Sequence, residues 1–375
     1  MAALLPDVDP DGLLEFSVVF TDRSLNHMSQ SFQGVMRDIS TLLKEVYNAD
    51  HVALVPGGGT YAMEAVARQL VTDQKAMVIR NGWFSYRWSQ IFEAGGLPAS
   101  EHVLKARQIG NERTAPFAPA PIEEVCAAIK NERPAVVFAP HVETASGMIL
   151  PDDYLETLAA AVHEVGGLFV LDCIASGCAW VDMKARGVDV LISAPQKGWS
   201  ASPSAGLVMM NDAAAETVLA RNSNSFAIDL KKWLTIMQAY ENGGHAYHAT
   251  MPTDALRRFR DIMLETRDYS FAKLSKAQWE LGNRVREMLA SRSVKSVAAP
   301  GFGAPGVVVS YTGDAGVQNG SKFAALGVQI AAGVPLMCDE PEGYSTFRLG
   351  LFGLDKLKDV DATIARLEAA LDQVL

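Results

Sequence analysis

Between residues 50 and 211, short apolar runs rich in β-branched residues alternate with segments of helical periodicity. Several of these runs are apolar on both faces, which is typical of parallel strands that lie beneath layers of helices. We expect strands over Val52–Val55, Ala76–Arg80, Ala135–Ala139, Leu168–Asp172, Val188–Ser193 and Gly206–Met210, with helices such as Tyr61–Leu70 and Tyr154–Glu164 between them. The pattern predicts an α/β domain with a doubly wound, mostly parallel sheet covered by helices.

From about residue 255 the pattern changes. We expect a long charged helix from Thr253 to about Ser291, strands over Gly306–Tyr311 and Ser345–Gly350, and a closing helix over Val360–Leu375. A chain of 375 residues is long enough for one large domain and a smaller one. The sequence therefore predicts an N-terminal extension (1–15), a large domain (16–260) and a small C-terminal α+β domain (261–375).

The composition excludes several classes of function. The chain carries 33 basic and 43 acidic residues, a net charge of −10 without a basic stripe, so we expect no nucleic-acid partner. It has no apolar run long enough to span a membrane, and its first residues lack the basic stretch of a signal peptide. The four cysteines have neither metal-site nor disulfide-framework spacing: Cys126, Cys173, Cys178 and Cys338. We therefore expect reduced thiols, no metal and a cytoplasmic location.

Two charged residues end successive apolar strands. Gly167–Asp172 ends in a carboxylate, and 25 residues later Val190–Lys197 ends in an amine. Such a pair can hold opposite ends of pyridoxal 5'-phosphate (PLP), with Lys197 in a Schiff base to the aldehyde and Asp172 paired with the ring nitrogen. The alternatives are a helix-capping acid and a solvated loop lysine. The prolines, glycine and tryptophan around Lys197 do not suit an exposed lysine, and desolvation would lower its pKa and favour imine formation.

Three more loops follow expected strands. In Pro56–Thr60 the glycines and the following helix N-terminus suit a phosphate, and Thr60 could cap that helix, although a turn without a ligand is equally plausible. The aromatic segment Asn81–Arg87 could stack on a planar ring or pack in a core. The hydroxyls of His141–Gly147 could reach a ligand or form only a turn. Because ligands of open α/β sheets bind at the carboxyl ends of the strands, five such segments together favour a cofactor site.

Two later segments add candidates. Arg348, within the apolar strand pattern Thr346–Gly350, could pair with a core acid or bind a substrate carboxylate. Tyr247–Pro252 offers two hydroxyls in a loop that by itself would be interpreted as a turn.

Taken together, these motifs resemble the class V aminotransferases of PLP fold type I, most closely the alanine/serine–glyoxylate (or pyruvate) aminotransferase branch. The resemblance runs from about His27 to the C-terminus. Its motifs occur in order: Gly-Gly-Gly-Thr at 57–60, Asn-Gly with aromatics at 81–84, His-x-Glu-Thr-x-Ser-Gly at 141–147, Asp172-x-x-Ala-Ser, Ser-x-x-Gln-Lys ending at Lys197, Tyr247-His-x-Thr-x-Pro, and Arg348-Leu-Gly.

The resemblance implies a role for each site residue. Lys197 would carry the cofactor and move a proton between the substrate Cα and the cofactor, while Asp172 would keep the ring nitrogen protonated. The other cofactor contacts would be Gly58, Gly59 and Thr60 at the phosphate with Gln196 beside it, Thr144 at the ring oxygen, Ile174 beneath the ring, and Phe84, or the adjacent Trp83, stacked on it. Tyr247 and Thr250 would reach the phosphate in a neighbouring subunit, which requires a homodimer, and Arg348 would bind the substrate carboxylate.

The implied reaction is ping-pong transamination between a small amino acid, such as alanine or serine, and glyoxylate or pyruvate. One departure from the family concerns the substrate pocket. Relatives usually carry a Gly-Pro-Gly-Pro stretch there, whereas this chain has Phe16–Phe20, so we expect a different and more apolar wall.

Two other functions remain open at the level of sequence. A lyase of the cysteine desulfurase type could use Cys338 as its nucleophile, but those relatives have histidines where this chain has Phe84 (or Trp83) and Gln196. A non-catalytic binding protein would leave Lys197 and Asp172 without a role.

Overall fold

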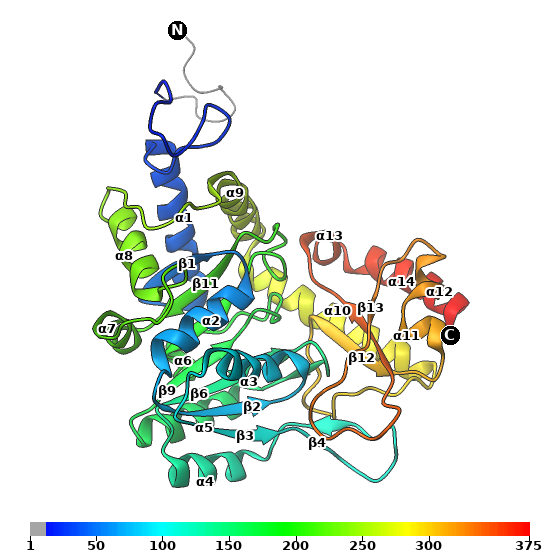
Figure 1. Ribbon diagram of the computed structural model, residues 1–375. Coiled ribbons are helices and arrows are strands. Elements are labelled where there is room, and N and C mark those ends of the chain that lie inside the picture. Colours follow the sequence, from blue (N-terminus) through cyan, green and yellow to red (C-terminus); the bar gives the residue numbers. More distant parts are fainter. Residues whose placement is uncertain (1–12) are drawn as a thin grey trace.

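The computed structural model describes residues 13–375. Residues 1–12, which include most of the expected N-terminal extension and the stretch examined for a signal peptide, lie outside the described range. The N-terminal part of the chain, through β11 near residue 210, is built around a seven-stranded sheet (Figure 1). In spatial order its strands are β1 (His51–Pro56), β11 (Ala205–Met210), β10 (Val190–Ser193), β9 (Leu168–Asp172), β6 (Val136–Pro140), β2 (Lys75–Arg80) and β3 (Ser100–Lys105).

The sheet is mostly parallel, as the sequence predicts. Strands β10, β9, β6, β2 and β3 run in one direction, and β11 runs against them. Because β1 is antiparallel to β11, it shares the direction of β10. The six predicted strands all form, and β9 and β10 are almost entirely buried, which explains their apolar sequences. Strand β3 was not predicted.

Helices enclose this sheet. They are α1 (Gln30–Tyr47), α2 (Gly59–Leu70), α3 (Trp83–Gly95), α4 (Ile122–Glu132), α5 (Asp152–Glu164), α6 (Met183–Arg186), α7 (Asp212–Ala220), α8 (Leu230–Glu241) and α9 (Thr253–Tyr269). Helices α2 and α3 pack on each other and on the central strands, whereas α4 and α5 form a second pair with α5 on β9. Two short ribbons, β4 (Arg107–Gln108) with β5 (Phe117–Ala118) and β7 (Val142–Glu143) with β8 (Met148–Ile149), complete this part.

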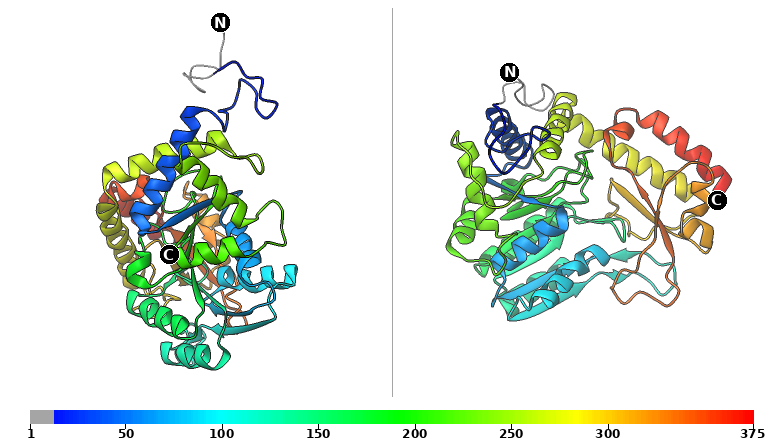
Figure 2. Two further views of the ribbon diagram at one scale, coloured as in Figure 1. Left: turned by 90° about the vertical axis from the view of Figure 1, so that its left-hand side faces the viewer. Right: turned by 45° about the horizontal axis from the view of Figure 1, so that its top comes forward.

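The C-terminal part lies beside the large sheet and has its own three-stranded antiparallel sheet (Figure 2). That sheet has the order β12 (Val307–Tyr311), β14 (Thr346–Gly350) and β13 (Ala331–Ala332). Its helices are α10 (Phe271–Ser291), α11 (Ala315–Gln318), α12 (Ser321–Ala324), α13 (Leu354–Leu357) and α14 (Val360–Val374). The predicted strands and the predicted closing helix are confirmed. The domain division at residue 260 falls within α9 and stays a prediction.

The prediction of one long helix from Thr253 to Ser291 was wrong. The chain breaks at Ser270, whose φ of 89° lies outside the helical region. The Ser270 side chain then accepts a hydrogen bond from the backbone N–H of Lys273 and caps α10. The carbonyl oxygen of Phe271 accepts a hydrogen bond from the indole of Trp180, which ties the start of α10 to the large part.

Among residues 13–375, no helix has the length and apolar composition that crossing a bilayer requires.

Candidate active site

A cavity of about 480 Å³ lies where the parallel strands of the large sheet end. The loops after β1, β2, β6, β9 and β10 all reach it, as expected from the shared direction of these strands. Nine of the predicted site residues line it: Gly58, Gly59, Thr60, Phe84, Thr144, Asp172, Ile174, Gln196 and Lys197. Tyr247, Thr250 and Arg348 are not among its lining residues.

Asp172 ends the central strand β9, between Pro140 of β6 and Ile192 of β10. Its carboxylate accepts a hydrogen bond of 2.9 Å from the backbone N–H of Ile174 and no other among the described residues. Burial raises the pKa of this carboxyl to about 7, although the nearby cations Arg87 and Lys197 oppose the rise. A buried acid with so few donors is suited to a cationic ligand atom.

The amine of Lys197 has no hydrogen-bond acceptor and no ion-pair partner within residues 13–375. Its Nζ lies 5.3 Å from the centre of the Phe352 ring. Burial lowers the pKa of the amine, as do the neighbouring guanidinium groups of Arg348 and Arg87. These conditions favour the neutral, nucleophilic form of a lysine.

The glycine turn leads directly into α2, with Gly58 as the N-cap residue. Among the described residues, the backbone N–H groups of Gly58, Gly59 and Thr60 have no acceptor, so the helix N-terminus can receive an anion. A Cβ on Gly59 would lie 2.5 Å from Cδ1 of Ile174, so a larger residue here would displace the Ile174 side chain. The prediction that Thr60 caps α2 was wrong, because the helix begins at Gly59 and Thr60 lies within its first turn.

Arg87 is a site residue that the sequence analysis did not single out. It lines the cavity from α3, and its Nη1 donates a 2.9 Å hydrogen bond to the hydroxyl of Thr60. Its cationic group therefore lies beside the free N–H groups of the glycine turn. Helical spacing from Phe84 to Arg87 would have indicated that both side chains share a face of α3.

Glu143 positions the aromatic loop. Its fully buried carboxylate accepts hydrogen bonds from the backbone N–H groups of Phe84, at 3.3 Å, and Ser85, at 2.8 Å, at the N-terminus of α3. Burial raises the pKa of this carboxyl, and the hydrogen bonds oppose that rise. In this arrangement Phe84, and not Trp83, lines the cavity.

Arg348 lies next to the cavity, on β14 of the C-terminal part. Its guanidinium carbon is 5.7 Å from the centre of the Phe84 ring, and its Nε donates to the carbonyl oxygen of Ala332. The group is half-buried, and burial lowers its pKa while the charge of Glu143 opposes this. An arginine in this position can bind a carboxylate that enters beside Phe84.

The remaining predicted residues lie apart from the cavity of their own chain. The hydroxyls of Tyr247 and Thr250 are 3.1 Å apart in an exposed loop between α8 and α9. None of the residues in Phe16–Phe20 lines the cavity, and Phe16 and Val18 are 87% and 100% exposed. Within a single chain, the expected apolar wall is therefore absent from the site.

Cys338 does not have the environment of a nucleophile. It is buried, and its thiol donates to the carbonyl oxygens of Arg80 and Leu336. Burial raises the pKa of the thiol to about 12, so the thiolate is strongly disfavoured. Cys338 also does not line the cavity, and the lyase alternative loses the residue on which it depended.

The cavity therefore offers an unpaired amine, a buried carboxyl and a set of free N–H groups beside a cation. These features fit the aldehyde, the ring nitrogen and the phosphate of PLP. Within residues 13–375, no cluster of three or more histidine, cysteine or acidic residues could hold a metal ion.

Comparison with known sequences identifies the family. The sequence profile of Aminotransferase class-V matches residues 16–243. This chain belongs to the class-V aminotransferases. The family is PLP-dependent, in agreement with the residues of the cavity.

Among named relatives, 2-aminoethylphosphonate–pyruvate transaminase of Paraburkholderia phymatum is 29% identical over 246 residues, which span 64% of this chain and 60% of that protein. Alanine–glyoxylate aminotransferase of Felis catus is 26% identical over 64% of this chain and 56% of its own length. The matched segment thus covers less than two thirds of these relatives. The crystal structure of an alanine–glyoxylate aminotransferase from Nostoc sp. has the same fold, with a TM-score of 0.78, 22% identity, and coverage of 93% of this chain and 88% of that one.

Proposed function

We propose that this class-V aminotransferase transfers the amino group of a small α-amino acid, of the alanine or serine type, to a small 2-oxo acid such as glyoxylate or pyruvate. The observation that carries the proposal is the unpaired amine of Lys197 in one cavity with the buried carboxyl of Asp172. The names of the relatives, which act with pyruvate or glyoxylate, support these acceptors. The transfer proceeds in two half-reactions with the same residues.

When bound, PLP supplies an aldehyde that condenses with amines and a ring that withdraws electrons from the substrate Cα. Lys197 holds the cofactor and then, as a free amine of lowered pKa, takes the proton from the substrate Cα. The carboxylate of Asp172 pairs with the ring nitrogen and keeps that nitrogen protonated. The first turn of α2 and Arg87 bind the phosphate.

The cationic groups at the site limit how many carboxylates a substrate can carry. Two guanidinium groups lie close to the Phe84 ring, with Cζ of Arg87 at 5.3 Å and Cζ of Arg348 at 5.7 Å from its centre. Of these two, Arg348 binds the α-carboxylate. Arg87 donates to Thr60 at the phosphate end, so we assign it to the phosphate and not to a second substrate carboxylate. Small monocarboxylic substrates fit this set of charges better than dicarboxylic ones.

A homodimer is part of the proposal. Its support is a group of exposed apolar side chains near the Tyr247 loop and the N-terminal segment: Leu13, Leu14, Phe16, Val18, Phe226 and Tyr247. Large apolar side chains left exposed together are typical of an interface. In the dimer, Tyr247 and Thr250 of one copy reach the phosphate in the other.

The four free cysteines support a reducing compartment, the cytoplasm.

The test is a half-reaction screen. Purified PLP-loaded protein is mixed with single amino acids, and the loss of cofactor aldehyde absorbance is recorded. L-Alanine or L-serine should give the change, Lys197→Ala should abolish it, and Lys130→Ala, which removes an exposed lysine, should not. If no small α-amino acid changes the spectrum of the wild-type protein, the proposed activity is incorrect.

A further inference from the structure

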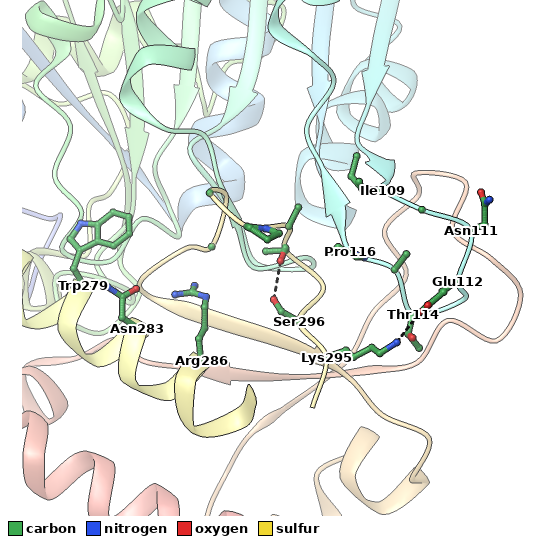
Figure 3. A pocket seen from close by; sticks show the side chains of 17 residues that line it. Ile109, Asn111, Glu112, Thr114, Pro116, Trp279, Asn283, Arg286, Lys295 and Ser296 are labelled. Carbon is green, nitrogen blue, oxygen red and sulfur yellow. Dashed lines mark hydrogen bonds and ion pairs between the residues drawn. The ribbon is translucent and has the colours of Figure 1, made fainter. Parts of the chain in front are cut away.

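A second cavity, of about 820 Å³, lies between the β4–β5 ribbon and the C-terminal part. Three segments line it: the loop 109–116, one face of α10, and the stretch 295–303 that precedes β12 (Figure 3). No described residue lines both this cavity and the active-site cavity. It is therefore a separate space from the active-site cavity.

Arg286 of α10 points into this space (Figure 3). Its Nη2 donates to the carbonyl oxygen of Ala304, and no carboxylate within residues 13–375 pairs with it. Nearby arginines differ: Arg284 pairs with Glu280 and Asp361, and Arg292 pairs with Glu368 and Asp372. Burial lowers the pKa of the Arg286 guanidinium to about 10, because no neighbouring charge offsets the loss of hydration.

The wall behind Arg286 is shaped to receive its guanidinium. A Cβ on Gly303 would lie 2.6 Å from Nε and 2.8 Å from Cζ of Arg286, so the side chain rests directly on the glycine backbone. This stretch of chain is fixed from behind, since Ala304 N–H donates to Gly147 O and Ile149 N–H to Phe302 O, each at 2.8 Å. The guanidinium is thereby held in place before any ligand arrives.

The rest of the lining favours a small organic anion. Lys295 and Glu112 form an ion pair of 2.7 Å, which leaves Arg286 as one unbalanced positive charge in a chain of net charge −10. Apolar atoms come from Ala115, Pro116, Ala298, Ala299 and Pro300, and the indole of Trp279 is 39% exposed. The volume lies within the range of small-molecule sites, about 300–1,000 Å³.

We propose that this cavity is a second ligand site, which binds a small carboxylate with a flat apolar body. The carboxylate pairs with the guanidinium of Arg286, and the apolar body lies against the alanine and proline lining and the indole of Trp279. The carboxylate of the ligand supplies the negative charge that Arg286 lacks among the described residues.

The test uses PLP-loaded protein, naphthalene-2-carboxylate as the probe and its neutral analogue naphthalene-2-carboxamide as the matched control ligand, with binding measured by calorimetry. The carboxylate should bind at least about tenfold more tightly than the amide. Arg286→Gln should remove this preference, whereas Arg284→Gln, which removes the same charge from the same helix outside the cavity, should keep it. Equal binding of the two ligands, or no binding of the carboxylate, would overturn the proposal.

Two further variants separate this site from the active site and guard against misfolding. Gly303→Ala retains every charge but displaces the Arg286 guanidinium, and it should weaken carboxylate binding as well. Arg348→Gln should leave the affinity for the probe unchanged. If Arg348→Gln abolishes binding while Gly303→Ala does not, the probe occupies the active site and the second site does not exist.

Discussion

The buried carboxyl of Asp172 indicates that the cavity binds a ligand with a cationic atom. A carboxyl at the centre of a sheet loses its hydration, and one backbone N–H does not compensate for a full charge. In the protein without cofactor, burial therefore favours the neutral acid and raises its pKa to about 7, from an ordinary value of 3.8. A protonated ring nitrogen in the cavity would reverse this preference and stabilise the carboxylate.

The raised pKa of Asp172 predicts how the stability of the cofactor-free protein depends on pH. The pKa of Asp172 is raised in the folded state, so the neutral carboxyl contributes to the free energy of unfolding. This contribution is fully present below about pH 4 and is lost as the pH rises to about 7. Asp172→Asn removes the ionisation and keeps the shape. The free energy of unfolding of the variant, relative to wild type, should therefore be higher at pH 8 than at pH 5.

Urea unfolding of the two cofactor-free proteins at both pH values measures this difference. Asp268→Asn, which removes an exposed carboxyl, serves as the control. A relative stability that is the same at pH 5 and pH 8 would contradict the assignment of a buried, destabilised carboxylate to Asp172.

The extent to which single residues can be predicted from the sequence depends on where they lie. Lys197 and Asp172 follow apolar strands, so their position at the carboxyl edge follows from strand direction alone. Arg87 was missed because its role depends on how α3 packs beside α2, which the sequence does not display. Cys338 was considered as a nucleophile because nothing in the local sequence reveals that its loop folds inward against Arg80.

At the scale of elements, the errors in prediction have physical causes. Strand β3 lies at the edge of the sheet and is partly exposed, so its sequence Ser-Glu-His-Val-Leu-Lys lacks the apolar signal of the inner strands. The break at Ser270 occurs without glycine or proline, and the helical periodicity continues across it. There the hydrogen bond of Trp180 to Phe271 and the cap on α10 outweigh local helix propensity.

The N-terminus of α2 gives a prediction that compares two glycines in helices. Gly59→Ala places a methyl group against Ile174, and overpacking of this kind costs about 1–3 kcal/mol. Because Ile174 forms part of the cofactor cavity, affinity for PLP should fall by about tenfold or more. Gly34→Ala in α1, where no atom lies within 4 Å of the added methyl group, should instead stabilise the protein by about 0.5–1 kcal/mol.

PLP titration of the cofactor-free proteins and thermal unfolding measure the two effects. Gly34→Ala should bind PLP as the wild type does. Unchanged PLP affinity in Gly59→Ala would show that the first turn of α2 does not contact the cofactor.

At the scale of the whole molecule, the active-site cavity of one chain is incomplete under the proposed function. Tyr247 and Thr250, which the proposed function assigns to the cofactor phosphate, lie outside it, and the apolar N-terminal segment is exposed. Both features have one explanation if two copies exchange these segments across a two-fold axis. The sequence could predict the motif but not the distance between its residues and the cavity of their own chain.

Subunit complementation tests this exchange directly. Lys197→Ala removes the amine proposed to hold the cofactor. The double variant Tyr247→Ala, Thr250→Ala removes the two hydroxyls proposed to contact its phosphate. Each homodimer should therefore be inactive or severely impaired. When the two are unfolded, mixed in equal amounts and refolded, half of the molecules become heterodimers. If the sites are shared, each heterodimer has one site with intact Lys197, Tyr247 and Thr250, and activity should recover to about a quarter of that of the wild type. If each chain used only its own residues, no heterodimer would contain an intact site, and mixing would restore nothing.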